Sequence, residues 1–477
     1  MENSSFYSVL LENFGMEPTE EQSVLFSDLE SFARDRKGKQ LFLLKGYAGT
    51  GKTSVLGAFV KTLGHYKVKT MLMAPTGRAA KVFSSKSEKG TLTIHKLIYR
   101  RKSKTDFGSP ISLMPNLQRK TLFIVDEASM IGDYSMQNDG NINSRNLLQD
   151  LFEYVYSSEG CKLILMGDDG QLPPVGSDHS PALNQDYLNN YYPELNIRSF
   201  KLNEVVRQAQ DSEILRNATL LRNTNWVDYP RFDIQQQTDL IRLSGMDLQD
   251  ELESSISKYG TEDAIVITRS NKNANKYNQQ IRGRIMWFEE KLCGGDALMV
   301  VKNNYFWLGD ESKVGFIANG EIIKVRRVLK VEELFGFEFA HLLVTFPDYE
   351  DLGDVELIIH TESLLVEAPN LPRDRIKALF YEIERDYIQI TNKKKRYEAI
   401  LNDPYFNALQ VKYAYAVTCH KSQGGQWKHV YIDQGYISEE MMGPDYYRWL
   451  YTALTRGTEK VFLVNFSDEF FIGEPQD

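Results

Sequence analysis

Short apolar runs alternate with helical patterns through the first half of the chain. Four runs have the length of a strand, and each ends in a polar or glycine-containing turn: residues 41–44, 70–73, 121–125 and 163–166. Each run is apolar throughout, which is typical of strands buried on both faces of a parallel sheet. The first half of the chain therefore predicts an α/β domain.

The second half repeats this pattern around a different kind of segment. Strand-length apolar runs recur at residues 264–267, 430–432 and 461–464. Three intervening stretches look like short antiparallel strands: residues 296–302, 320–328 and 337–345. Asn319-Gly320 is a hairpin signal within this segment. The pattern predicts a small β-barrel inserted in a second α/β domain.

Two further segments complete the predicted organisation. Apolar residues at steps of three and four from Ile376 to Ile390 predict an amphipathic helix that starts after Pro372, and a basic run, 393–396, follows it. A basic, turn-rich stretch between the second and third strands predicts an inserted arm. The predicted domains are 1–97 with 117–235, the arm 98–116, 236–290 with 412–477, and the barrel with its helical extension 291–411.

Composition limits the class of protein without choosing a function. The 477 residues are too many for one compact core, and 42% apolar with 25% charged residues is ordinary for a globular protein. The net charge of −9 argues mildly against a protein that coats nucleic acid non-specifically. A local basic groove stays compatible with that charge, because screened contacts act over about 10 Å.

The cysteines and the N-terminus indicate a cellular location. Cys161, Cys293 and Cys419 are far apart and form no CxxC pair, which argues against a zinc site, an iron–sulfur cluster or a disulfide framework. Residues 1–15 lack the basic segment of a signal peptide, and no apolar run approaches the ~18 residues that a membrane span needs. We expect a cytoplasmic protein without a membrane partner.

A glycine-rich segment follows the first predicted strand. Residues 46–53 match the pattern GxxxxGK[ST] at every position and precede a helical stretch at 54–63. In this context backbone N–H groups surround nucleotide phosphates at the N-terminus of a helix. Lys52 is expected to reach the β- and γ-phosphates, and the Thr53 hydroxyl is expected to bind Mg²⁺. The nucleotide-binding candidates here are Gly46, Gly49, Thr50, Gly51, Lys52, Thr53 and Ser54.

An acidic pair, Asp126-Glu127, follows the third predicted strand. Asp126 is expected to hold the Mg²⁺ through water, and Glu127 to orient or deprotonate the attacking water. Such a pair is weak evidence by itself, but it follows the phosphate loop in the expected order. The two motifs together predict an ATP or GTP hydrolase.

Five further segments complete a set of motifs. They are APTGRAAK at 74–81, TIH at 93–95, GDDGQLPPV at 167–175, VTCHKSQG at 417–424 and LYTALTRG at 450–457. In this order, together with the phosphate loop and the acidic pair, they resemble the motifs of superfamily 1 helicases. The resemblance is closest to the 1B branch that contains RecD and Dda. It covers nearly the whole chain, from residue 22 to about 457.

This resemblance implies two RecA-like parallel-sheet domains that hydrolyse ATP with Mg²⁺ in their shared cleft. It further implies 5′→3′ movement along single-stranded DNA. It assigns adenine recognition to Gln22, whose amide both donates and accepts, and the sensing of hydrolysis to Gln171. Arg456 from the second domain and Arg207 at the same cleft would stabilise the transferring phosphate. The nucleotide-binding set is completed by Gln423 and Gly424.

The resemblance also implies a track for the nucleic acid across both domains. Hydroxyl, imidazole and ammonium groups suit phosphate and sugar contacts. The positions that match the family's strand contacts are Thr76, Thr93, His95, Thr418, His420 and Lys421. The family's arm is a strand-separating hairpin, so Phe107 or a neighbour is expected to stack on the terminal base pair of a DNA junction, although the sequence of the arm departs from the family's pattern. A solvated basic loop is the alternative for this arm, and a solvated helix end is the alternative for the run 393–396.

Other functions remain open on the sequence. An RNA helicase of the same superfamily would share the backbone-contacting motifs, because only the 2′-hydroxyl distinguishes the two polymers. A regulatory NTPase could use the hydrolysis cycle as a switch without travelling. A nuclease fusion is disfavoured, because every long segment is assigned and no additional carboxylate–lysine cluster stands out.

Overall fold

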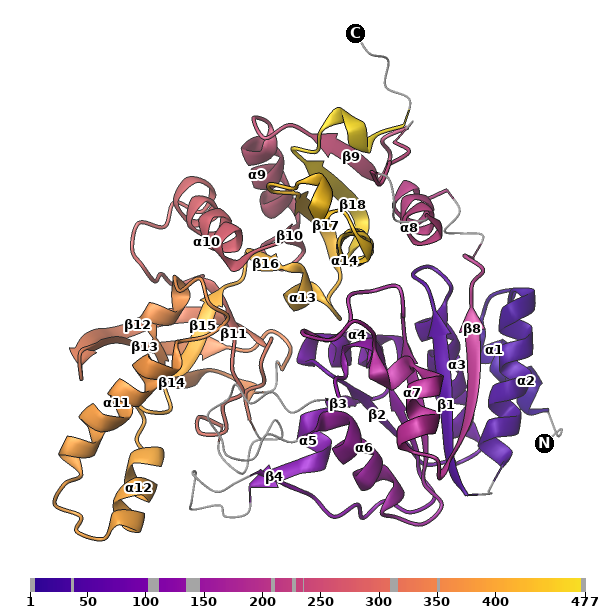
Figure 1. The fold of residues 1–477 in the computed structure, drawn as a ribbon, viewed down its shortest axis with the longest axis horizontal. Coiled ribbons are helices and arrows are strands. Elements are labelled where there is room, and N and C mark those ends of the chain that lie inside the picture. Colours follow the sequence, from indigo (N-terminus) through magenta and orange to yellow (C-terminus); the bar gives the residue numbers. More distant parts are fainter. Residues whose placement is uncertain are drawn as a thin grey trace.

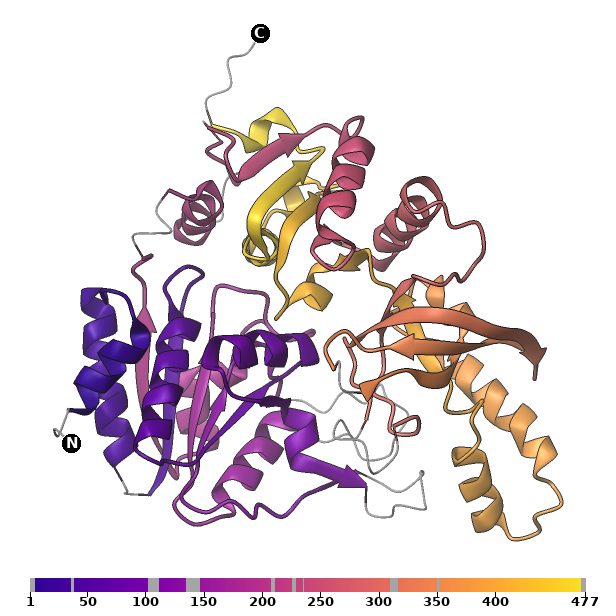
Figure 2. The ribbon, with the colours of Figure 1, turned by 180° about the vertical axis from the view of Figure 1, so that it is seen from behind.

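The computed structural model describes residues 5–35, 38–101, 111–133, 146–206, 211–224, 229–234, 236–308, 316–349 and 352–472. Figure 1 shows one sheet at the lower right, a second sheet above it and a barrel at the left. In the reverse view of Figure 2, a helical extension projects from the barrel, away from both sheets. None of the described helices is long and apolar enough to cross a membrane.

The first sheet has six parallel strands in the order β3-β2-β6-β7-β1-β8. Their bounds are β1 (Lys39–Gly46), β2 (Thr70–Ala74), β3 (Thr91–Thr93), β6 (Leu122–Val125), β7 (Lys162–Gly167) and β8 (Leu195–Leu202). Phe42 and Leu44 of β1 pack into one helical layer, whereas Leu41 and Leu43 pack into the other. Burial on both faces explains why this strand is apolar throughout.

Helices cover both faces of the first sheet. One layer contains α1 (Phe6–Phe14), α2 (Glu20–Arg34), α3 (Lys52–His65) and α4 (Gly77–Ser87). The opposite layer contains α5 (Ile94–Ile98), α6 (Leu147–Tyr156) and α7 (Gln185–Tyr191). A capping box begins α2, in which Thr19 and Gln22 each accept a hydrogen bond from the other's backbone N–H. This motif fixes the side chain of Gln22.

The second sheet has five parallel strands in the order β16-β10-β17-β18-β9. Their bounds are β9 (Leu240–Leu243), β10 (Ala264–Thr268), β16 (Ala416–Thr418), β17 (Trp427–Asp433) and β18 (Gly457–Val464). The helices of this domain are α8 (Glu213–Asn223), α9 (Leu248–Tyr259), α10 (Asn271–Gln280), α13 (Cys419–Ser422) and α14 (Pro444–Leu454). The prediction of two parallel-sheet domains is confirmed.

A closed barrel is inserted in the second domain, as the sequence predicts. Its strands are β11 (Ala297–Val300), β12 (Ile322–Leu334), β13 (Phe337–Thr345), β14 (Val355–His360) and β15 (Leu409–Tyr413). The barrel closes because β15 pairs with both β11 and β14. The helical extension consists of α11 (Arg373–Asp386) and α12 (Lys393–Leu401). In the first domain, β4 (Tyr99–Arg101) pairs antiparallel with β5 (Ile111–Leu113) at the base of the predicted arm.

Three details differ from the sequence-based expectations. The turn at Asn319-Gly320 exists, but β11 and β12 are joined through residues 301–321 and not by a tight hairpin. Helix α11 ends at Asp386, so Ile390 lies beyond it, and the basic run opens a separate helix capped by Asn392. Helix α8 and residues 229–234 pack into the core of the second sheet and not with the first.

Candidate active site at the junction of the two sheets

The glycine-rich segment forms the loop between β1 and α3. Gly49 and Gly51 have φ angles of 77° and 79°, a conformation that favours glycine. A Cβ at Gly51 would lie 2.7 Å from Gln22 Nε2, and one at Gly49 would lie 2.9 Å from Leu215 Cδ1. The loop brings backbone N–H groups to the N-terminus of α3, where the partial positive charge favours a phosphate.

Lys52 and Gln22 lie against this loop. The Lys52 ammonium donates a hydrogen bond to the Tyr47 carbonyl at 2.7 Å, so it is folded over the loop. Gln22 is buried, and its Nε2 donates to the Thr50 carbonyl at 3.0 Å. Its Oε1 accepts from Thr19 in the capping box, so both ends of this amide are bonded within the protein. Adenine recognition by Gln22 stays a prediction.

The acidic pair lies at the carboxyl end of β6. Asp126 is buried, and its Oδ1 accepts from the Glu127 backbone N–H at 2.7 Å. Burial, together with the neighbouring charge of Glu127, raises the pKa of Asp126 to about 7, and the charge of Lys52 opposes this shift. The Asp126 carboxylate and the Thr53 hydroxyl are hard oxygen donors of the kind that Mg²⁺ prefers. These residues could therefore hold that ion.

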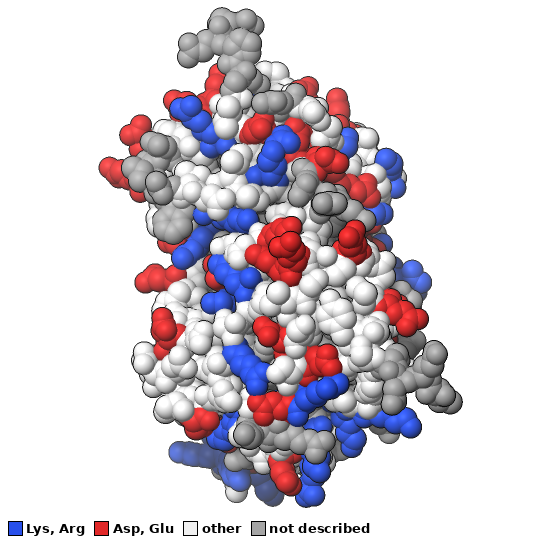
Figure 3. Space-filling model, turned by 90° about the vertical axis from the view of Figure 1, so that its right-hand side faces the viewer, with Lys and Arg blue, Asp and Glu red and all other residues white. Residues whose placement is uncertain are grey.

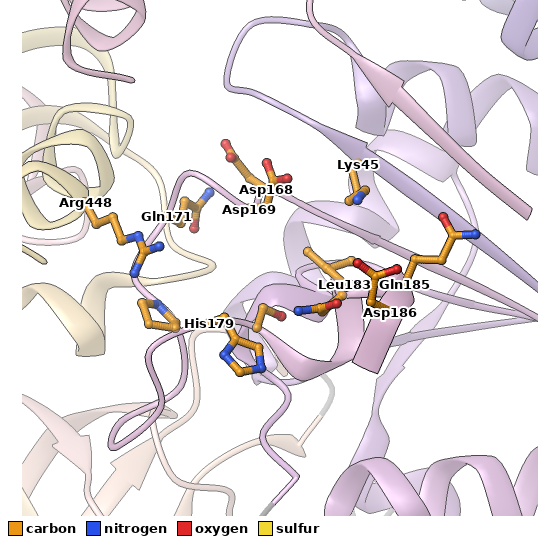
Figure 4. A pocket seen from close by; sticks show the side chains of 12 residues that line it. Lys45, Asp168, Asp169, Gln171, His179, Leu183, Gln185, Asp186 and Arg448 are labelled. Atoms are coloured by element: carbon orange, nitrogen blue, oxygen red, sulfur yellow. The ribbon is translucent and has the colours of Figure 1, made fainter. Parts of the chain in front are cut away.

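A cavity of ≈ 410 Å³ lies at the carboxyl ends of β1 and β7. Figure 4 shows Asp168, Asp169 and Gln171 along its edge, with Arg448 reaching in from the second domain. Gln171 is buried, and its Oε1 has no hydrogen-bond partner among the described residues. A buried amide oxygen without a donor is costly, so this atom is positioned to accept from a bound water or ligand.

The second domain meets these loops through α14. The Tyr451 hydroxyl accepts from the Ala48 backbone N–H at 2.8 Å and donates to Asp168 Oδ2 at 2.6 Å. Thr452 Oγ1 accepts from the Leu172 backbone N–H at 2.8 Å. Hydrogen bonds thus connect the phosphate loop and the segment after β7 directly to the second domain.

Arg456 follows α14 and is buried, with only 3% of its surface exposed. Its Nε donates to the Thr452 carbonyl at 3.0 Å, and its Nη1 donates to the Gly425 carbonyl at 3.3 Å. Gly425 lies against the first domain, because a Cβ there would be 3.1 Å from Arg78 Cδ. The guanidinium is therefore next to the junction and not on an outer surface, although these hydrogen bonds stay within the second domain.

Gln423 and Gly424 also lie at the junction. Gln423 Nε2 donates to the Leu172 carbonyl at 2.7 Å. A Cβ at Gly424 would lie 2.9 Å from the Ala79 Cβ of α4. Both residues therefore contact the first domain, and their contact with nucleotide stays a prediction.

The predicted strand contacts of the first domain lie where β2 and β3 end. Thr76 and Thr93 cap α4 and α5, and their hydroxyls accept from the backbone of Ala79 and Lys96. Thr93 is 1% exposed, so its hydroxyl is enclosed by protein. Thr76 and His95 are half-buried. Of these three residues, Thr76 and His95 are the ones that an external strand could reach.

The predicted strand contacts of the second domain follow β16. Thr418 precedes α13 and makes no capping hydrogen bond with its side chain, and His420 is exposed. Lys421 Nζ donates to Asn319 Oδ1 at 2.6 Å, which links α13 to the barrel. Burial lowers the pKa of Lys421 to about 8. Arg207 and Phe107 lie outside the described residues, so their roles stay predictions.

Several residues at the junction were not found from the sequence. Tyr451 and Thr452 contact the first domain, and Arg78 stacks over Trp427 with its guanidinium carbon 4.0 Å from the ring centroid. The available signal was their spacing, because Tyr451 and Thr452 lie five and four positions before Arg456, on the helix that ends just before it.

Two family models match the chain in the order of its two sheets. A AAA domain model matches residues 33–244, which include the phosphate loop, the acidic pair and Gln171. A UvrD-like helicase C-terminal domain model matches residues 413–464, which include Arg456.

Individual relatives are distant. An uncharacterized protein, R530, of Acanthamoeba polyphaga mimivirus is 24% identical, and the alignment covers 88% of this chain and 94% of that protein. The ATP-dependent DNA helicase Pif1 of Psychrobacter sp. is 23% identical, over 84% of this chain and 64% of that protein. The ATP-dependent RecD2 DNA helicase of Deinococcus radiodurans is 30% identical over 38% of this chain and 21% of that protein. A crystal structure of Pif1 helicase from Bacteroides in complex with ADP-AlF3 and ssDNA has a TM-score of 0.48 and 17% identity, and covers 96% of this chain and 95% of its own.

The two sheets, with a phosphate loop on the first and a buried arginine from the second at one junction, define a two-domain enzyme that binds and hydrolyses ATP. The helicase domain model adds that the second sheet resembles the C-terminal domain of UvrD-like helicases. With the ordered motifs, the chain is similar to the RecD- and Pif1-like helicases.

Proposed function

We propose that this chain is an ATP-dependent DNA helicase that moves 5′→3′ along single-stranded DNA and separates duplex ahead of it. The observation that carries the proposal is the composite junction, in which Tyr451 and Thr452 of the second domain bond to the loops of the first beside Arg456. A site built from two domains can couple its occupancy to their relative position. The RecD2 and Pif1 relatives are named DNA helicases, which supports DNA as the track.

Each residue of the junction has a proposed task. Lys52 binds the β- and γ-phosphates, while Thr53 and Asp126 hold Mg²⁺, which neutralises charge on the phosphate oxygens. Glu127 accepts a proton from the attacking water. The free amide oxygen of Gln171 orients that water. Arg456 exchanges its hydrogen bonds to Thr452 and Gly425 for the γ-phosphate when the cleft closes.

The proposed track crosses the carboxyl ends of strands in both sheets. Thr76 and His95 lie on the first domain, and Thr418, His420 and Lys421 on the second. Figure 3 shows the side of the molecule that lies at the right of Figure 1, where acidic and basic side chains are mixed and basic ones are numerous along the lower edge. The net charge of −9 is therefore not spread evenly over the surface, and it does not by itself oppose a track. Phosphate contacts respond to local charge within about 10 Å.

The protein is proposed to act in the cytoplasm as a monomer. Its three cysteines are free thiols, which suits a reducing compartment. Both halves of the proposed site come from one chain, so a monomer is sufficient for the proposed chemistry.

A tailed-duplex assay tests the proposal. We expect unwinding of a duplex that carries a 5′ single-stranded tail, and none with a 3′ tail of the same sequence. ATPase stimulation by poly-dT above poly-U supports DNA, whereas the reverse preference would assign the protein to RNA. ATP hydrolysis without unwinding of either duplex would instead indicate a regulatory NTPase that does not travel along nucleic acid.

Glu127→Gln is expected to bind ATP normally and to lose turnover. The amide retains the shape of the side chain but cannot accept a proton, and general bases contribute about 10²–10⁴ in rate. Nucleotide affinity and kcat should be measured on the same preparation. Glu153→Gln, on the exposed side of α6, is the control and should keep the parent kcat. A Glu127→Gln protein that hydrolyses ATP at the parent rate would remove Glu127 from the mechanism.

A further inference from the structure

One face of α14 is directed at the first domain. Arg448, Tyr451 and Thr452 have the spacing i, i+3 and i+4, so they share that face. Arg448 Nη1 donates to the Asp178 carbonyl at 2.8 Å, and Thr452 Oγ1 accepts from Leu172. Figure 4 shows Arg448 extending from the second domain toward the cavity edge. Arg456 follows directly after this helix, so any movement of the face moves Arg456.

Tyr451 makes the contact that reaches the phosphate loop. It is 2% exposed, and its hydroxyl lies between two groups that are 120 positions apart in the first domain, the Ala48 N–H and the Asp168 carboxylate. Burial and the nearby charge of Asp168 raise the pKa of Tyr451 well above its ordinary value. The hydroxyl therefore keeps its proton, donates it to Asp168, and uses its oxygen to accept from Ala48.

Ala48 lies in the glycine-rich loop, residues 46–53, whose backbone N–H groups are expected to bind the phosphates of a nucleotide. In this structure the Ala48 N–H is directed at a tyrosine oxygen from the other domain, 403 positions away in sequence. One N–H makes one strong hydrogen bond, because strength falls steeply when the angle departs from linear. A phosphate oxygen and the Tyr451 hydroxyl therefore compete for it.

We propose that Tyr451 is a nucleotide-sensing positioning residue, whose hydroxyl holds the Ala48 N–H in the nucleotide-free enzyme and yields it to a phosphate of ATP. The exchange breaks one of the links between α14 and the first domain, and so loosens the contact of the helix that precedes Arg456. The inference rests on the proposed function, because it assumes that the loop binds ATP. It adds a specific route by which occupancy of the loop reaches the second domain.

Tyr451→Phe tests this competition, because it keeps the ring and removes the hydroxyl. The probe is a fluorescent non-hydrolysable ATP analogue with Mg²⁺ and no nucleic acid. Affinity is expected to rise about two- to tenfold, the range that corresponds to the net value of one hydrogen bond. A merely structural role predicts the opposite sign, since damage to the junction weakens binding.

Tyr446→Phe is the matched control. Tyr446 lies on the same helix and is also 2% exposed, but its hydroxyl accepts from Gln434 Nε2 at 3.0 Å within the second domain. Its affinity for the analogue should equal that of the parent protein. Thermal unfolding of both variants establishes that the comparison is between folded proteins.

Unchanged or weaker binding by Tyr451→Phe would overturn the inference and leave the proposed function intact. A parent protein that binds no analogue would overturn the proposed function itself, and the inference with it. If Tyr451→Phe does not fold, Asp168→Asn gives the same test. It replaces the charged acceptor of the hydroxyl by a neutral one, and Asp169→Asn is its control, because it removes the same charge nearby from a residue that bonds to Lys201 and not to Tyr451. Binding tighter than that of Asp169→Asn supports the competition, and equal or weaker binding rejects it.

Discussion

Lys52→Ala is expected to lower kcat for ATP by at least about 10²–10³-fold, the loss seen when one preorganised charge-stabilising donor is removed from a reacting centre. The ammonium is already folded over the phosphate loop at Tyr47, and its charge acts on the buried Asp126. Lys201 also contacts this loop, but it donates to the Tyr47 hydroxyl at 2.7 Å and pairs with Asp169, so it does not replace Lys52. Steady-state hydrolysis with saturating single-stranded DNA provides the measurement.

Lys61→Ala is the matched control for this variant. Lys61 lies on the same helix but pairs with Glu88 at 2.7 Å on the surface, away from the loop. Its replacement should leave kcat unchanged, because exposed ion pairs contribute little. Hydrolysis by Lys52→Ala at the rate of Lys61→Ala would show that the glycine-rich loop is not the ATP site.

Much of the fold follows from local sequence. The runs at 41–44, 264–267 and 461–464 are strands because they are buried on both faces, and such burial leaves a continuous apolar signal. The phosphate loop is equally local, because Gly49 and Gly51 adopt a conformation that other residues avoid. Motifs carried by backbone geometry or strand burial could therefore be located from residues alone.

Features that depend on distant partners could not be located in this way. Strand β8 is on the edge of its sheet, and its Arg198 pairs with Asp35 at 2.6 Å, so no continuous apolar run marks it. Helix α8 follows the first sheet in sequence, but Ile214 and Leu221 pack in the core of the second. Tertiary packing, and not the position of α8 in the sequence, therefore determines the domain to which this helix belongs.

Side-chain contacts between the two domains could not be located from the sequence either. Tyr451 is one aromatic residue of an amphipathic helix, and nothing in its neighbourhood indicates a partner 403 positions away. Gln22 looks available for adenine in the sequence, whereas the fold uses its amide to cap α2 and to bind the Thr50 carbonyl. Side-chain roles at an interface between domains therefore require the structure.

Arg456→Ala is expected to slow hydrolysis by about 10³–10⁵-fold and to leave strand binding intact. The reason is the position of the guanidinium, which is buried beside the junction. In the proposed mechanism it reaches the γ-phosphate only when the domains close. The proposed strand contacts are residues elsewhere in both domains, so fluorescence anisotropy with labelled single-stranded DNA should give the parent affinity. Single-turnover hydrolysis then isolates the chemical step.

Two companion variants separate this catalytic loss from a structural one. Arg456→Ala removes one donor from each of the Gly425 and Thr452 carbonyls, so its thermal unfolding must be compared with that of the parent. Arg456→Lys retains a charge but not the planar fork, and should recover part of the rate. Arg326→Ala, on the barrel and 63% exposed, should match the parent in every assay. A folded Arg456→Ala protein that hydrolyses ATP at the parent rate would show that Arg456 takes no part in hydrolysis. Another residue of the second domain would then have to couple hydrolysis to domain movement.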